Sequence, residues 1–143
     1  MELSRCINFL LSAAQHTVFQ YLNGQLAPYG ITPAQYGVLN CLWKHQTLTP
    51  KQLGELLKIE ASSISSVLDR MQKSGLIERN INPDNRRVVH VSLTPKGSEL
   101  QPAIELLIQD MNDLVMEPFS KEDRDTILRS LSLIANLTLE KSE

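Results

Sequence analysis

Two arginines in the middle of the chain have the charge and the surroundings for binding phosphate. Arg86 and Arg87 belong to the turn-forming stretch Asn82-Pro83-Asp84-Asn85-Arg86-Arg87, which predicts a basic hairpin tip that includes Asn85. Guanidinium groups bind phosphates, and an arginine at such a tip can enter the minor groove of A·T-rich DNA. A solvated hairpin tip would have the same residues, but we favour the DNA contact.

Four serines precede this tip in a segment from about Ala61 to Lys73. They are Ser62, Ser63, Ser65 and Ser66. Serine is a mediocre helix former, so four of them on one helix face indicate a role other than helix propensity. Hydroxyls can bond phosphates or base edges, although they discriminate poorly between bases. We predict that these serines contact DNA, and the alternative is a polar face in solvent.

Three further polar residues are candidates for the same interface. Lys51 and Gln52 follow Thr49-Pro50, and the N–H groups at such a helix start can bind phosphate. Plain capping by Gln52 would also explain this pattern, and both roles can hold. Arg70 could reach a phosphate or brace its helix against the hairpin, and the sequence leaves these two roles open.

The elements that must position these side chains follow from periodicity and turn residues. A helix begins at Thr49-Pro50, and a second helix over about 61–73 ends at Gly75. Two strands, Leu76 to Asn80 and Val88 to Leu93, flank the tip. Two helices joined by a tight turn and followed by a basic hairpin are the layout of a winged helix-turn-helix that binds DNA.

Amphipathic helices are expected on both sides of this motif. Apolar residues at steps of three and four predict helices at 3–27, 33–45 and 95–116, and a last helix from Lys121. Thr32 and Ser120 are the expected caps of the second and the last of these helices. The predicted fold class is mainly α with a small β-wing. We expect one domain, 1–143, with the winged helix at about 32–97 and dimerisation helices at about 1–30 and 98–143.

Charge is unevenly distributed along the 143 residues. Residues 51–97 contain eight basic and five acidic residues, whereas 98–143 contain four basic and ten acidic ones. The positive middle is where we expect phosphate to bind. No apolar run is long enough for a membrane span, and two cysteines suit a reducing compartment, so we expect a cytoplasmic protein without membrane contact.

Five motifs stand in order along the chain. They are Ile31-Thr32-Pro33-Ala34-Gln35-Tyr36-Gly37-Val38-Leu39, Leu53-Gly54-Glu55-Leu56-Leu57, Val67-Leu68-Asp69-Arg70-Met71, Gly75-Leu76-Ile77-Glu78-Arg79, and the stretch from Pro83 to Gly97. At these spacings the chain resembles the MarR family of bacterial transcriptional regulators over nearly its whole length. The resemblance implies a homodimer that binds a pseudo-palindromic operator in double-stranded DNA. It usually implies repression relieved by a small, often aromatic, ligand or by oxidation.

One wing position departs from the family pattern. The family commonly has Asp-x-Arg there, and this chain has Asn85 and Arg87. In the family the aspartate steadies the wing arginine. Asparagine can accept a hydrogen bond but contributes no charge, so we expect a weaker interaction or its replacement by Asp84.

Cys6 raises an alternative form of regulation. One MarR subgroup, the organic-peroxide sensors, uses a cysteine near the start of the first helix. Counting back from Thr32-Pro33 places that position at Ile7, and one residue on a helix is a rotation of about 100°. We therefore favour a core or surface thiol, with redox sensing by Cys6 as the alternative, and we expect Cys41 to serve packing.

Catalytic and metal-binding patterns are missing from the sequence. It has no paired-carboxylate, Ser-His-Asp or Cys-His constellation and no Gly-rich phosphate loop, so we expect no enzyme activity and no cofactor. Its three histidines lack the spacing of metal ligands. Tyr21, Tyr36 and Trp43 could line a ligand pocket, although such aromatics are more often core residues. The ligand-binding residues stay undetermined.

Overall fold

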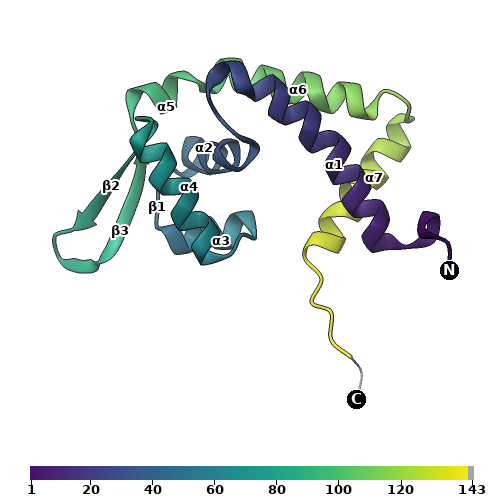
Figure 1. The fold of residues 1–143 in the computed structure, drawn as a ribbon, viewed down its shortest axis with the longest axis horizontal. Coiled ribbons are helices and arrows are strands. Elements are labelled where there is room, and N and C mark those ends of the chain that lie inside the picture. The colour runs from purple at the N-terminus through teal and green to yellow at the C-terminus, as the bar shows by residue number, and fades with distance from the viewer. Residues whose placement is uncertain (142–143) are drawn as a thin grey trace. The chain divides into compact units, whose positions relative to one another are not determined.

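The computed structural model, which describes residues 1–141, is mostly helical with a small antiparallel sheet (Figure 1). This arrangement confirms the predicted fold class. The elements in chain order are η1 (Leu3–Arg5), α1 (Ile7–Leu26), η2 (Ala27–Tyr29), α2 (Pro33–His45), β1 (Thr47–Leu48), α3 (Pro50–Leu57), α4 (Ala61–Lys73), β2 (Ile77–Asn82), β3 (Asn85–Leu93), α5 (Pro95–Glu99), α6 (Gln101–Met116) and α7 (Lys121–Ala135). The chain forms two compact units that divide within α6, between Ile108 and Gln109.

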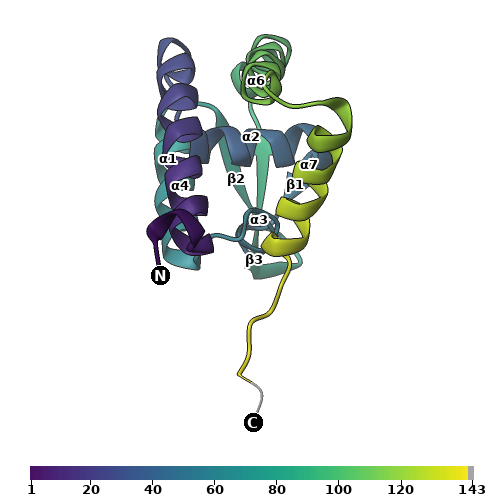
Figure 2. The ribbon, with the colours of Figure 1, turned by 90° about the vertical axis from the view of Figure 1, so that its right-hand side faces the viewer.

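The core of the first unit lies between α2, α3, α4 and the sheet. The three helices contact one another (Figure 1, Figure 2). Leu39, Leu53, Leu68 and Met71 are at most 1% exposed. Burying such a side chain contributes roughly 1.5–3 kcal/mol, so this core holds α4 with its serine-bearing face outward.

Side-chain caps begin the helices where the sequence predicts. The Thr32 hydroxyl accepts a hydrogen bond from the Gln35 backbone N–H at 3.2 Å, and Thr49 caps α3 in the same way through Gln52. Ser120 caps α7 by accepting from the Asp123 backbone N–H at 3.1 Å. Each cap satisfies a donor that the helix itself leaves unpaired, which confirms these three predicted helix starts.

The sheet has the strand order β1-β3-β2, and its hairpin turn is shorter than predicted. β2 and β3 remain paired to Asn82 and Asn85, so the turn itself is Pro83-Asp84. The Asn82 side chain accepts from the Asp84 backbone N–H at 2.9 Å, which closes the turn in two residues. The predicted six-residue tip is therefore wrong, and Arg86 and Arg87 lie on β3.

Residues 47–48 form a third strand of the sheet that local sequence signals do not predict. Thr47 of β1 pairs with Ser92 of β3, and Leu48 pairs with Val91. The free edge of β3 supplies the backbone partners that this short segment needs.

Two of the predicted long helices are interrupted. The first begins as η1, Cys6 is extended with φ −87° and ψ 114°, and α1 starts at Ile7. The other is divided into α5 and α6 at Leu100. Pro102 has no N–H to donate to the carbonyl of Ser98 four residues earlier, so one helical hydrogen bond is lost where the helix divides.

The second unit consists of the end of α6, a turn and α7. Within it the Arg124 Nε donates to the carbonyl oxygen of Phe119 at 2.9 Å. Large apolar side chains of α7 are exposed, among them Leu128 at 60% and Leu133 at 63%. No helix in residues 1–141 combines the length and the apolar character needed to cross a bilayer.

Candidate nucleic-acid interface

The serines of α4 form an exposed hydroxyl face on the helix. Ser62, Ser63, Ser65 and Ser66 are all exposed. Ile64, Leu68 and Met71, on the opposite face, are at most 2% exposed, because three- and four-residue steps place them together against the core. The helix is therefore anchored through its apolar face, and its hydroxyls are open to a partner.

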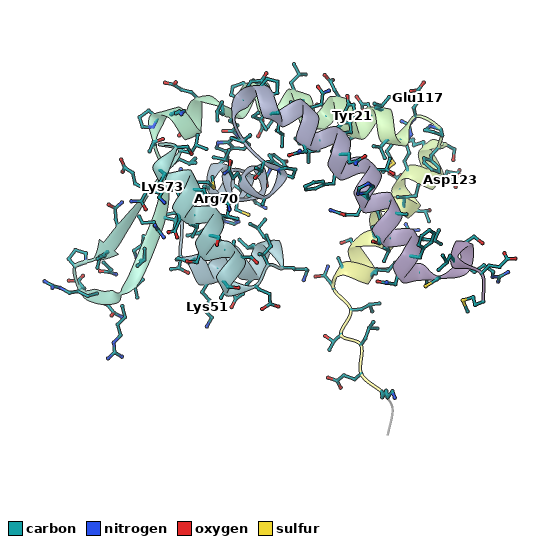
Figure 3. All side chains as sticks on the ribbon, viewed as in Figure 1. Tyr21, Lys51, Arg70, Lys73, Glu117 and Asp123 are labelled. Carbon is teal, nitrogen blue, oxygen red and sulfur yellow. The ribbon has the colours of Figure 1, made fainter. Side chains whose placement is uncertain are left out.

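Cations continue this polar face toward the end of α4. Arg70 and Lys73 are exposed and lie in the last turn of the helix (Figure 3). Their charge is also favourable near the negative end of the helix dipole. The bracing role that the sequence left open for Arg70 is filled by another residue, Arg79. Contact of Arg70 with phosphate stays a prediction.

Arg79 of β2 braces the wing against α4. One guanidinium nitrogen donates to the Asp69 carboxylate at 2.6 Å, and its Nε donates to the Gln72 amide oxygen at 2.6 Å. The side chains of the ion pair are 30% and 51% exposed, so solvent screening limits its contribution to about 0.2–1 kcal/mol. Its main effect is orientation, because a fork of donors fixes the start of β2 on two successive turns of α4.

Sequence reasoning did not single out Arg79. Its two acceptors, Asp69 and Gln72, stand three residues apart on α4 and so share one face of the helix. The nearby arginine on the following strand was a usable signal. The distance between strand and helix was still needed to show that all three meet.

Lys51 and Arg87 lie at one groove, although they are far apart in the sequence. The groove has a volume of about 380 Å³ and is lined by Thr49, Pro50, Lys51, Arg87, Val88 and Val89. Lys51 is at the start of α3 (Figure 3). Two cations at one groove, which is otherwise lined mainly by apolar residues, attract a phosphate through their charge.

Gln52 is committed to the local structure of α3. The side-chain amide oxygen of Gln52 accepts a hydrogen bond from the Thr49 backbone N–H at 2.9 Å. The backbone N–H of Gln52 donates to the Thr49 hydroxyl at 3.2 Å. These bonds establish the capping role. Gln52 is exposed, and a phosphate contact by this residue stays a prediction.

The wing residues Asn85, Arg86 and Arg87 are all exposed. The Asn85 side-chain oxygen accepts from the backbone N–H of Arg87 at 3.1 Å, so it steadies the strand and not the guanidinium. Within residues 1–141 the only ion pair joins Arg79 and Asp69. The expected replacement of the family aspartate by Asp84 is therefore not observed, and both wing guanidinium groups keep their charge available.

The two cysteines are free thiols in different settings. Cys6 is partly buried and immediately precedes α1, outside the helix, so the rotation argument based on a helical position 6 is wrong. Burial raises the pKa of the Cys41 thiol, which disfavours the reactive thiolate. This protonated, partly buried thiol agrees with the packing role predicted for Cys41.

Two of the three aromatic candidates lie together. The Tyr36 and Trp43 ring centroids are 6.4 Å apart, and the Trp43 indole N–H donates to the Gly97 carbonyl at 3.0 Å. Burial raises the pKa of Tyr36, opposed by a hydrogen bond from Asn40. Tyr21 lies on α1 and is 38% exposed (Figure 3).

Comparison with known proteins matches the region that contains these sites. A model described as the MarR family matches residues 31–89, from just before α2 into β3. The organic hydroperoxide resistance transcriptional regulator of Bacillus subtilis (strain 168) is 36% identical over 101 residues, which are 71% of this chain and 69% of that protein. The multiple antibiotic resistance protein MarR of Salmonella typhimurium is 37% identical over 79 residues, 55% of each chain.

A solved structure supports the same fold. The crystal structure of a mutant MarR from E. coli complexed with operator DNA superimposes with a TM-score of 0.82 at 26% identity. The match covers 90% of this chain and 92% of that one, so it includes the terminal helices as well as the winged helix.

Proposed function

We propose that this chain, which belongs to the MarR family of transcriptional regulators, binds a pseudo-palindromic DNA operator as a homodimer. It acts as a repressor, and a small molecule releases it from the operator. The resemblance of its motifs to the family and the operator complex of the similar E. coli structure support DNA binding.

One observation carries the proposal: Lys51 and Arg87 line one groove, and the serine hydroxyls of α4 are exposed on the same unit. Helix α3 contacts both α4 and β3, so the three parts belong to one packed body. In this proposal helix α4 enters the major groove, and Ser62, Ser63, Ser65 and Ser66 contact base edges and phosphates. Arg86 and Arg87 contact the backbone or the minor groove through the wing.

A dimer would place two copies of helix α4 on the two halves of one operator. Two recognition helices about 34 Å apart enter successive major grooves on one face of a duplex. Exposed apolar side chains on α1, such as Ile7 at 65%, and on α7, such as Leu128 at 60%, supply surfaces for a second copy. The operator is then a pseudo-palindrome because the protein is two-fold symmetric.

Binding of generic duplex DNA at several salt concentrations tests the proposal. Affinity should fall steeply with salt, since each phosphate contact releases counterions. The double variant Arg86→Ala with Arg87→Ala should flatten the slope by about 1–2 contacts per subunit. The matched control, Lys121→Ala with Arg129→Ala, removes two cations from α7 and should leave the slope unchanged. Failure of the ligand-free protein to bind at low salt would overturn the proposal.

A redox-controlled release is the second candidate. It is favoured by the name of the Bacillus subtilis relative, an organic hydroperoxide resistance regulator, and by Cys6 just before α1. In this form, mild peroxide oxidises the Cys6 thiol and the protein leaves DNA. Mass spectrometry should locate the oxidation at Cys6. If Cys6→Ser still leaves DNA on peroxide treatment, this candidate is wrong.

A further inference from the structure

A second groove of the first unit lies where α2, the sheet and the α5–α6 joint meet. It has a volume of about 420 Å³ and is lined by Leu42, Trp43, Gln46, Thr47, Ser92, Leu93, Ser98 and Gln101. This volume lies within the range of sites for small molecules. None of its lining residues belongs to the candidate DNA interface, and none carries an ionisable side chain.

One wall of this groove is apolar and held in place. Leu93 contributes aliphatic surface and Trp43 contributes an indole ring, and the fully buried Leu42 lies behind them. The ring is fixed by its N–H bond to the Gly97 carbonyl at 3.0 Å and by the Tyr36 ring, with centroids 6.4 Å apart. A fixed aromatic wall costs little further ordering when a ligand binds, which favours a flat apolar partner.

The remaining walls offer hydrogen bonds without charge. They contain the hydroxyls of Thr47, Ser92 and Ser98 and the amides of Gln46 and Gln101. The Gln101 amide nitrogen donates to the Glu105 carboxylate at 2.7 Å, so its carbonyl oxygen remains as an acceptor. The nearby Glu105 carboxylate would repel an anion, while no lining cation would attract one.

The backbone at Gln46 is strained at this groove. Its φ of 66° and ψ of −52° lie near the γ-turn conformation, which residues with a side chain rarely adopt. The Gln46 N–H donates to the Leu42 carbonyl at 2.8 Å and closes α2. Such strain persists where surrounding structure enforces it, and it is concentrated at binding sites. Here it turns the chain so that Gln46 and Thr47 both line the groove.

We propose that this groove binds a small uncharged molecule with one flat apolar face and amide or hydroxyl groups at its edge. The flat face packs against Trp43, and the edge exchanges hydrogen bonds with the hydroxyls and amides opposite. Such a ligand touches α2, β1, β3 and the α5–α6 joint at once, and it selects against carboxylates because the groove offers them no cation.

Benzamide and benzoate test the proposal, because they have nearly the same shape and differ in charge. Trp43 is the one tryptophan of the chain, so its indole N–H gives a single resonance from a residue that lines this groove. Benzamide should shift that resonance saturably, with a Kd on the order of 1 mM as expected for a ligand of this size. Benzoate should bind at least about tenfold more weakly, the discrimination expected when a charge loses its water without a partner.

Variants locate the binding in the groove. Ser98→Leu fills the space beside Trp43 and should weaken benzamide at least tenfold, while Ala103→Leu adds the same side chain at an exposed position of α6 and should not. Ser98→Ala, which removes only the hydroxyl, serves if the larger variant fails to fold by circular dichroism, and it should weaken benzamide about threefold.

Three results would overturn the proposal. The first is no shift of the Trp43 resonance at about 10 mM benzamide. The second is that benzoate binds as tightly as benzamide. The third is that Ala103→Leu weakens benzamide binding as much as Ser98→Leu does. The sample contains no DNA, so failure here is distinguishable from failure of the proposed DNA binding.

Discussion

The apolar residues of α4 and those of α7 follow similar helical periodicities but have different environments. On α4, Ile64, Leu68 and Met71 are at most 2% exposed. On α7, Leu128, Leu131 and Ile134, which share one face of the helix, are 60%, 46% and 40% exposed. The first helix completes its packing within its own unit, whereas the second presents apolar surface beyond what a solvated helix needs. We infer that amphipathic periodicity indicates that a face will be covered, without indicating what covers it.

The largest expected effect separates a buried residue of α4 from an exposed residue of α7 by stability. Leu68→Ala removes a side chain that is 1% exposed, so it should lower the free energy of unfolding by about 2–5 kcal/mol through lost burial and a cavity. Leu133→Ala, at a 63% exposed position, should change it by less than about 0.5 kcal/mol. Urea denaturation measures both. Equal losses would show that Leu133 is covered as fully as Leu68.

The next effect concerns the proposed dimer. Leu128→Glu with Leu131→Glu places two charges on the exposed apolar face of α7, and it should raise the dimer dissociation constant at least about 30-fold, roughly 2 kcal/mol. Sedimentation velocity over a range of protein concentrations measures the fraction of dimer. Ser130→Glu, on the same helix, is the control and should remain dimeric. A dimer that survives the double substitution would place the interface away from this face of α7.

Helix caps give a smaller effect in both regions. Thr49→Ala and Ser120→Ala each remove a hydroxyl that accepts a backbone N–H at the start of a helix. Each should cost about 1 kcal/mol of stability in its own unit. Thermal unfolding of both variants measures this, with Thr49→Ser as a control that keeps the hydroxyl. If only Thr49→Ala destabilises, α7 does not depend on its cap for stability.

The Arg79 brace should affect DNA binding more than stability. Arg79→Ala removes a partly exposed ion pair with Asp69, so the free energy of unfolding should fall by only about 0.2–1 kcal/mol. The wing then loses its fixed orientation, and affinity for duplex DNA should fall severalfold. Arg79→Lys keeps the charge but not the two-acceptor fork, so it should bind DNA with intermediate affinity. Unchanged binding in Arg79→Ala would show that the wing needs no brace.

The smallest effect is on the reactivity of Cys41. Burial raises its pKa above the ordinary 9.0, so the folded chain contains less thiolate than the unfolded chain at mildly alkaline pH. In a Cys6→Ser background, iodoacetamide should therefore alkylate Cys41 more slowly before than after denaturation. The raised pKa stabilises the fold below the unfolded-state pKa, and this contribution is lost as pH rises through the folded-state pKa. Faster alkylation in the folded protein would contradict the packing role.

Local signals allowed most elements to be predicted. Thr32, Thr49 and Ser120 marked helix starts because a cap involves residues only three positions apart. Gly75, with φ 76°, ends the α4 region because the left-handed conformation favours glycine. The turn was predicted too long because strand pairing across Asn82 and Asn85 competes with the turn preference of these residues.

The residues of the candidate site could be predicted from the sequence, but their contacts across the fold could not. The sequence by itself determined which residues are cationic or hydroxyl-bearing, where the helices begin and which faces are apolar, since these depend on residue type and short spacing. Only the tertiary structure decided that Lys51 meets Arg87 at one groove, that Arg79 and not Arg70 braces the wing, and that Thr47 joins the sheet. Those contacts join residues many positions apart, and their free energy is gained only after the intervening chain has packed.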